Sequence, residues 1–303
     1  MLFFFGKKME RPLRDLPLAC PACALRTNAI CREINGVPIR RCSECGHQWW
    51  IADSMDLQTL YRDYYSGKDP SIGYDDYMAL AKALRQTFTN RIAQLERLIG
   101  GTPGSILDIG CGPGIFLEVA RSRGWRVQGI DPSESAGTAG KRAFGVNIRT
   151  GFFESSLYEN QRFNAITLWD TIEHLSDPFA VLRDCRGLLA PNGVVALTTG
   201  RADSVAARLS GNHWHLYTLP EHLHFFTGSS LGRCAARAGL NVVASRNEVA
   251  WYTISYLVER LVKKSRWGRK LTNAIRRSPL DIPVPATLFD ISSFILRSSA
   301  PRG

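Results

Sequence analysis

Residues 105–117 read S-I-L-D-I-G-C-G-P-G-I-F-L, and the rest of the chain can be placed around this stretch. Ile106, Leu107 and Ile109 are typical of a short buried strand, and Ile115 begins an apolar pattern that indicates a helix. The three glycines between these two segments predict a tight turn. A strand that leads through a glycine turn into a helix predicts a ligand site.

The positions of the glycines separate several classes of ligand. A dinucleotide fingerprint needs glycine at its first, third and sixth positions, and here the sixth position is Ile115. A phosphate-binding loop needs Lys-Ser or Lys-Thr at the start of the helix, but no basic residue comes before Arg121. Asp108 instead lies just ahead of the glycines. We therefore expect a ligand with positive charge, such as S-adenosylmethionine with its sulfonium and α-amino groups.

The segment D-I-G-C-G-P-G at 108–114 resembles motif I of the class I S-adenosylmethionine-dependent methyltransferases. The resemblance implies an α/β fold with a doubly wound, seven-stranded, mostly parallel sheet of the Rossmann-like kind. It also implies the residues of the turn that contact the cofactor: Asp108, Gly110, Cys111, Gly112 and Gly114.

Two later segments extend the predicted cofactor site. Residues 126–131 are expected to form the second strand, which ends in Asp131. An acid about twenty residues past the glycines can accept hydrogen bonds from both ribose hydroxyls of an adenosine. Residues 146–150 are the expected third strand, and the resemblance implies that Phe152 and Phe153, which follow it, contact the adenine.

The sequence W-D-T-I-E-H at 169–174 follows the expected fourth strand and resembles the W-D-x-x-E-H motif of one methyltransferase subgroup. The resemblance implies that Trp169 packs against the cofactor. Asp170, Glu173 and His174 would lie at the carboxyl end of the sheet, where α/β proteins bind ligands. The alternative for Glu173 and His174 is an internal pair that only fixes the loop. The N-P-P-Y, D-P-P-Y and Pro-Cys motifs of base-modifying methyltransferases are absent from the sequence.

The loop at 211–227 holds four of the six histidines, namely His213, His215, His222 and His224. Its P-E-H-L-x-x-F segment also resembles the same subgroup. Because a histidine titrates near neutral pH, it can take a proton from an attacking hydroxyl. We expect His222 to be the base, with His174 as the second candidate. A structural role in the loop is the alternative, and a metal site is disfavoured because the loop holds no Cys and one acid.

Two C-x-x-C pairs near the N-terminus, separated by eighteen residues, match the spacing of a zinc ribbon. The expected ligands are Cys20, Cys23, Cys42 and Cys45, with Cys31 and His47 as less favoured replacements. Paired disulfides or a redox C-x-x-C are the alternatives. Zinc binding would supply folding free energy on the order of 10 kcal/mol. Four protein ligands leave no open position, so we expect a structural site.

The composition limits the possible partners and locations. A chain of 303 residues with a net charge of +11 can hold one large and one small domain. The charge favours an acidic partner such as nucleic acid, anionic lipid or a phosphorylated substrate. No apolar run approaches the roughly 20 residues of a membrane span, and residues 2–5 are too short for a signal-peptide core. We expect a cytoplasmic protein.

The predicted organisation has three parts. Residues 1–50 form the zinc ribbon, residues 51–99 a linker and a helix that begins at about 75, and residues 100–303 the methyltransferase domain. A basic helical insert is expected at about 249–285. Within it, residues 251–278 hold eight basic side chains and a stripe of apolar ones, a pattern that can lie on an anionic membrane surface. Packing of the stripe on the domain is the alternative.

The sequence thus predicts an enzyme that transfers a methyl group from S-adenosylmethionine by in-line displacement. The favoured reaction is O-methylation of a small molecule, a glycan sugar or a lipid-linked precursor, with C-methylation of a sugar as a close neighbour. The alternative enzyme is an RNA methyltransferase, because ribosomal RNA methyltransferases can also carry a zinc ribbon. A hypothesis from another class is a protein that binds S-adenosylmethionine or nucleic acid without catalysis.

Overall fold

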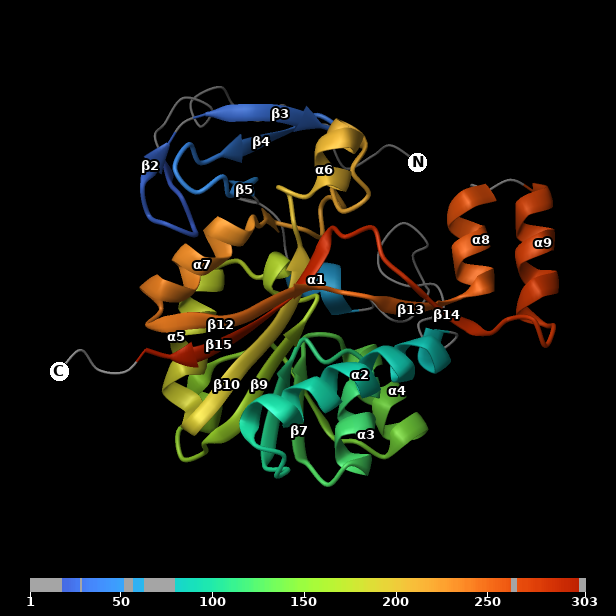
Figure 1. The fold of residues 1–303 in the computed structure, drawn as a ribbon, viewed down its shortest axis with the longest axis horizontal. Coiled ribbons are helices and arrows are strands. Elements are labelled where there is room, and N and C mark those ends of the chain that lie inside the picture. Colours follow the sequence, from blue (N-terminus) through green and yellow to red (C-terminus); the bar gives the residue numbers. More distant parts are fainter. Residues whose placement is uncertain (1–17, 28, 52–56, 63–79, 263–265, 300–303) are drawn as a thin grey trace.

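The computed structural model describes residues 18–27, 29–51, 57–62, 80–262 and 266–299. Its main body is a seven-stranded sheet in the order β12-β15-β10-β9-β6-β7-β8, with helices on both faces (Figure 1). This order confirms the predicted doubly wound fold. The strands are β6 (Ser105–Ile109), β7 (Arg126–Asp131), β8 (Ile148–Thr150), β9 (Phe163–Trp169), β10 (Leu189–Gly200), β12 (Leu240–Asn247) and β15 (Ile291–Ser298).

The helices cover the sheet in two layers, because its central strands are apolar on both faces. Residues 194–197 of β10, for example, are all fully buried. One layer is formed by α2 (Ala81–Ile99), α3 (Ile115–Ser122) and α4 (Glu134–Phe144), and the other by α5 (Pro178–Leu188) and α7 (Gly228–Arg237). β15 runs antiparallel between β10 and β12, while the other strands of this sheet pair in parallel.

Local capping signals place the helices as the sequence predicts. The Ser133 side chain accepts a hydrogen bond from the backbone N–H of Ala136 and begins α4. The Asp177 side chain caps α5 in the same way, and Thr227 forms a reciprocal capping box with Ser230 at the start of α7. Each cap fixes where the chain leaves the carboxyl edge of the sheet.

A few predicted boundaries are wrong by a few residues. The seventh strand begins at Ile291 instead of Leu288, because Phe289 has a φ of 57° and cannot continue a strand. The third strand begins at Ile148, since Val146 packs beside the glycine turn instead. Residues 75–79 of the predicted helix lie outside the described residues, as do Tyr64, Tyr65 and Tyr74 of the tyrosine-rich linker.

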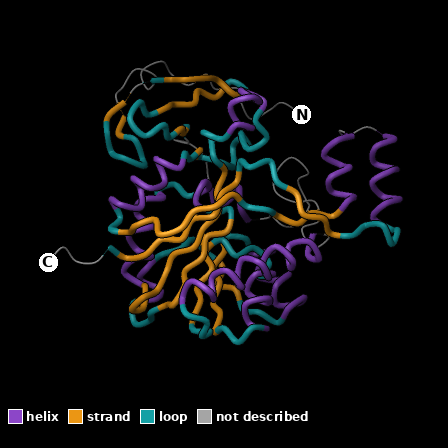
Figure 2. The backbone as a smooth tube through the Cα atoms, viewed as in Figure 1, coloured by secondary structure: helices purple, strands orange, loops and turns teal. Residues whose placement is uncertain are grey.

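The cysteine-rich segment shares a sheet with the histidine loop. It forms β1 (Leu18–Ala19), β2 (Arg26–Thr27), β3 (Ile30–Ile34), β4 (Val37–Arg41) and β5 (Gln48–Trp49). In its four-stranded sheet, β5 pairs antiparallel with β11 (His224–Phe225), which follows β10 in the main domain. The segment therefore lies on the side of the central sheet where β10 ends (Figures 1 and 2).

The basic insert is a helical hairpin on a two-stranded ribbon. β13 (Ala250–Thr253) and β14 (Pro283–Ala286) pair with each other, and between them the chain forms α8 (Ile254–Val262) and α9 (Arg266–Arg276). The expected helical insert is thus two helices joined as a hairpin, which project from the body (Figure 1). None of the helices in the described part of the chain is long and apolar enough to cross a membrane.

Candidate functional site

The glycine turn joins β6 to α3 at the carboxyl edge of the sheet. Gly110 has a φ of 71°, and a Cβ atom at this position would lie 2.6 Å from the side chain of Thr171. At Gly114 a Cβ atom would lie 2.8 Å from Val146. Because any side chain would be both strained and blocked, glycine keeps the backbone bare here. Glycine therefore lets the turn pack closely against Thr171 and Val146.

Two buried carboxylates flank this turn. Asp108 accepts a hydrogen bond of 2.6 Å from the Thr167 hydroxyl, and Asp131 accepts backbone N–H bonds from Gly112 and Ser133 at 2.8 and 2.9 Å. Burial raises the pKa of Asp108 to about 8 and that of Asp131 to about 6, although these hydrogen bonds favour the charged forms. A bound cation, or hydrogen bonds from ribose hydroxyls, would offset the cost of burying the two carboxylates in their charged forms.

The two carboxylates lie in a cavity of about 1250 Å³. This volume exceeds the several hundred to about 1,000 Å³ of a typical small-molecule site, so it offers room for two molecules. Gly112 and Gly114 support the turn without lining the cavity. The predicted site residues that line it are Asp108, Gly110, Cys111, Asp131, Phe152, Phe153, Trp169, Asp170, Glu173, His174 and His222.

A trio of predicted catalytic residues meets in this cavity. The Nδ1 atom of His222 lies 2.8 Å from the Leu216 carbonyl oxygen, and Nδ1 of His174 lies 3.0 Å from the Glu221 carbonyl oxygen. Since a carbonyl can only accept, both Nδ1 atoms carry the proton and both Nε2 atoms keep a lone pair. Glu173 is buried beside them, and its Oε2 atom has no hydrogen-bond partner among the described residues.

Burial sets the protonation of this trio. It lowers the pKa of His222 to about 4, and together with the neighbouring His222 it lowers the pKa of His174 to about 3. Burial and the charge of Asp170 raise the pKa of Glu173 to about 8. Both imidazoles are therefore neutral at pH 7 and able to accept a proton or bind a cation.

The same trio has the geometry of a metal site. One ligand atom from each of Glu173, His174 and His222 lies within 4.8 Å of the other two. The histidine loop alone lacks a mixed ligand set, as the sequence indicated, but the loop after β9 adds a carboxylate and a second imidazole. Nδ1–H bonds to backbone carbonyls are the usual way in which proteins orient metal-binding histidines.

The remaining histidines of the loop have separate environments. His215 lines the cavity and bonds Asp290 through Nε2 at 2.8 Å. His224 is buried against His47, with 3.1 Å between ring nitrogens, and His213 ends a short 3-10 helix. Of these three, only His224 lies in β11, which pairs with β5.

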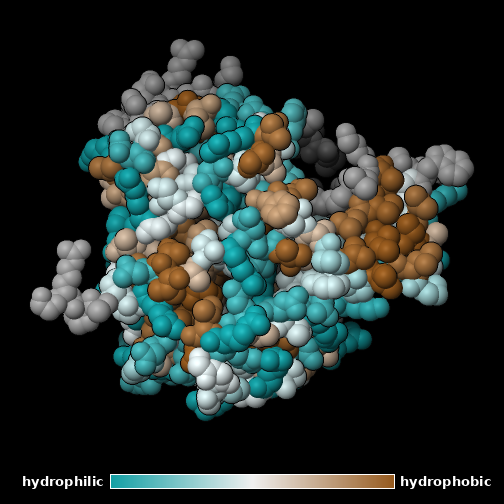
Figure 3. Space-filling model, in the orientation of Figure 1, coloured by the Kyte–Doolittle hydropathy of each residue, from teal (hydrophilic) through white to brown (hydrophobic). Residues whose placement is uncertain are grey.

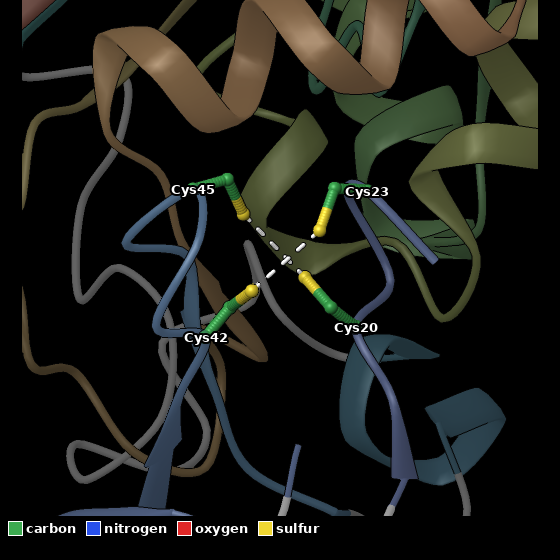
Figure 4. Close-up of side chains that lie close together, drawn as sticks. All are labelled: Cys20, Cys23, Cys42 and Cys45. Atoms are coloured by element: carbon green, nitrogen blue, oxygen red, sulfur yellow. Dashed lines mark hydrogen bonds between the residues drawn. The ribbon is translucent and has the colours of Figure 1, made fainter. Parts of the chain in front are cut away.

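The four predicted cysteine ligands point toward a common centre (Figure 4). Their sulfur atoms all lie within 4.8 Å of one another, with 3.6 Å between Cys20 and Cys45 and 3.5 Å between Cys23 and Cys42. Thiolates about 2.3 Å from one tetrahedral zinc ion would be roughly 3.8 Å apart. A disulfide would need about 2.05 Å. The cluster therefore fits zinc and does not contain disulfides.

Sequence reasoning missed two buried charged residues of the cavity wall, Arg91 and Glu248. Arg91 on α2 is buried and contacts Glu248 at 3.4 Å and Asp170 at 3.5 Å, with its guanidinium 4.9 Å from the centre of the Trp169 ring. The Tyr61 hydroxyl lies 3.1 Å from Nδ1 of His174. The residues of each of these pairs are far apart in the chain. In the sequence, only the position of Arg91 on an otherwise apolar helix face could have indicated that its side chain is buried at the site.

Comparison with known proteins gives the following matches. A family model described as "Methyltransferase domain" matches residues 80–245. A ubiquinone biosynthesis O-methyltransferase of Chromobacterium violaceum is 28% identical over 222 residues, covering 69% of this chain and 85% of that protein. One from Pseudomonas aeruginosa is 31% identical over 164 residues, covering 50% and 71%.

Solved structures resemble the chain in fold. Magnesium protoporphyrin IX methyltransferase from Synechocystis PCC 6803 superposes with a TM-score of 0.50 at 12% identity, covering 81% of this chain and 100% of that one. A methyltransferase from Streptomyces caelestis gives a TM-score of 0.50 at 13% identity with the same coverage. At these identities the likeness concerns the architecture alone.

The buried Arg91–Glu248 pair leads to a stability prediction. Replacing Arg91 with Leu leaves the Glu248 carboxylate buried without its nearest cation, so we expect a loss of about 3 kcal/mol in the free energy of unfolding. Replacing both residues with Leu should recover most of it, because no buried charge is left unpaired. Urea unfolding of the single and double variants measures this. Equal losses in both would mean that packing, not charge pairing, holds Arg91 in place.

Proposed function

Because the chain belongs to the methyltransferase family, we propose that it transfers the methyl group of S-adenosylmethionine to a hydroxyl oxygen of a small molecule. The observation that carries the proposal is the shared cavity, which is lined both by the buried carboxylates of β6 and β7 and by the Glu173, His174 and His222 trio. The names of the relatives, ubiquinone biosynthesis O-methyltransferases, favour an oxygen acceptor.

The cofactor would occupy the half of the cavity next to the glycine turn. Asp131 would bind the ribose hydroxyls, and Asp108 would face the positive charge of the methionine part. Phe152 and Phe153 would contact the adenine, and Trp169 would pack against the cofactor from β9. S-adenosylmethionine supplies a methyl group on a sulfonium that is already a good leaving group.

The acceptor would occupy the half of the cavity next to the trio. His222 would present its Nε2 lone pair there and take the proton of the acceptor hydroxyl. His174 and Glu173 would hold the His222 ring in place and stabilise the positive charge that it gains. The wall opposite includes Trp251 and the stacked rings of Tyr252 and Tyr256, whose centroids are 5.3 Å apart. Such a wall favours an acceptor whose hydroxyl is on a flat, apolar ring.

A second chemistry is open to the same trio. A divalent cation held by Glu173, His174 and His222 would satisfy the unpartnered Glu173 oxygen and lower the pKa of an acceptor hydroxyl. Burial lowers the pKa of His222 to about 4, so His222 is a weak base. This favours help from a cation in removing the proton of the acceptor hydroxyl. Both chemistries use the same residues and lead to the same product.

Turnover separates these possibilities. Replacing His222 with Ala should lower the rate of S-adenosylhomocysteine formation with small phenols by about 10²–10⁴-fold, while cofactor affinity stays within about twofold. His213→Ala, on the same loop but outside the cavity, is the control and should keep full activity. Loss of affinity with unchanged turnover would overturn the role of His222.

If a cation takes part, a chelator abolishes turnover at unchanged zinc content and Mg²⁺ restores it.

The cofactor site should respond to pH through Asp108. Burial raises its pKa to about 8 in the free protein, so the carboxyl is mostly protonated below this pH, and a bound cation favours its ionised form. We expect affinity for S-adenosylmethionine to rise by up to about tenfold per unit between pH 6 and 8 and then level off. Calorimetry measures it. A similar slope in Asp108→Asn would assign the effect to the cofactor's own amine.

We also propose that Cys20, Cys23, Cys42 and Cys45 bind one structural zinc ion. Elemental analysis should find one zinc per chain in the parent protein and in Cys31→Ser, because Cys31 is exposed and outside the cluster. Cys42→Ser should lose most of the metal and unfold at a lower temperature, since zinc binding contributes folding free energy. Full metal content and stability in Cys42→Ser would refute the zinc site.

A further inference from the structure

The α8–α9 hairpin carries apolar side chains that the body of the protein does not cover. Leu271 on α9 is 50% exposed, and Leu280 and Ile282, which follow it, are 70% and 49% exposed. Val258 and Val262 on α8 and Ile275 on α9 are only half-buried. Figure 3 shows a hydrophobic patch over α8 and α9. Contiguous apolar surface of this kind indicates an interaction site.

Among the described side chains of the hairpin, the buried ones are small or polar. Gly268 and Thr272, one turn apart on α9, are buried. Ser255 on α8 is also buried and donates its backbone N–H and hydroxyl to the Asp281 carboxylate at 2.8 and 2.9 Å. The two helices therefore close on each other and on the ribbon through small groups. Their larger apolar side chains are left for another partner.

Charge restricts the chemistry of that partner. Residues 249–285 contain eight basic side chains and two acidic ones, so the insert supplies more than half of the net charge of +11. Among the described basic residues, Lys270, Arg276 and Arg277 are exposed. Apolar residues next to basic ones complement the acyl boundary and headgroups of an anionic bilayer. Nucleic acid would use the basic residues but leave the apolar ones exposed to water.

The hairpin also borders the mouth of the cavity. Tyr252 on β13, Tyr256 and Leu257 on α8, and Leu288 after β14 line the cavity wall. Leu288 is itself 62% exposed. The apolar surface of the insert is therefore continuous with the acceptor half of the cavity.

We propose that the α8–α9 hairpin docks the protein on the surface of an anionic lipid bilayer. Leu271, Leu280 and the half-buried valines enter the headgroup and acyl boundary, and the basic residues contact lipid phosphates. The mouth of the cavity then faces the bilayer. The docking stands without the proposed function, whereas entry of an apolar acceptor from the lipid rests on it.

Sedimentation with vesicles tests the docking. We expect the protein to pellet with phosphatidylglycerol–phosphatidylcholine vesicles, to stay in solution with pure phosphatidylcholine, and to bind less as salt rises. Leu271→Asp/Leu280→Asp should weaken binding at least tenfold, and Arg277→Glu should weaken it severalfold. Leu209→Asp is the matched control, because Leu209 on α6 (Val205–Ser210) is an apolar residue that is 84% exposed outside the insert, and this variant should bind as the parent does.

Several results would overturn the proposal. One is that the protein does not bind anionic vesicles. A second is that Leu209→Asp and the double variant lose vesicle binding equally. A third is that the protein binds a short RNA but not vesicles, and that Arg277→Glu abolishes the RNA binding. Turnover with a water-soluble phenol serves as the separate readout. If the double variant keeps normal turnover but loses vesicle binding, the result supports the docking. If the parent protein binds vesicles but shows no turnover, the proposed reaction is refuted and the docking is not affected.

Discussion

The backbone pairing of β5 with β11 is the constraint on which the acceptor side of the site depends. His224 pairs with Trp49 and Phe225 with Gln48, and the Trp50 indole donates to the carbonyl oxygen of His222 at 2.8 Å. These bonds hold the histidine loop in an extended path, so that its carbonyl groups orient both imidazoles of the trio. Without them, a long loop after β10 would have no reason to adopt one conformation.

The features predicted from sequence were those that depend on local structure. The turn at Gly110, the acid that ends β7 at Asp131, and the cap at Thr227 each follow from a few neighbouring residues. The cysteine cluster was predictable because metal geometry fixes the spacing of its ligands. Together with the resemblance of residues 108–114 to motif I, these signals were enough to predict a doubly wound sheet and its carboxyl edge.

What the sequence could not supply depends on contacts between distant segments. Arg91 and Glu248 are 157 residues apart, and no local pattern pairs them. The histidines lie close together in the sequence, but His222 and His215 line the cavity whereas His224, in β11, does not, and no local pattern separates them. The helical insert was predicted, but its division into the two helices α8 and α9 was not.

The shared four-stranded sheet also has a consequence for how this protein can vary. A zinc ribbon attached by a flexible linker can be lost or exchanged as a unit, but here the last strand of the cysteine-rich segment pairs with β11 of the histidine loop. A shortened chain that begins at α2 would expose the edge of β11, and exposed edges recruit strands from other molecules. The ribbon and the acceptor loop must therefore change together in evolution, and grafting either one onto another methyltransferase would require the other.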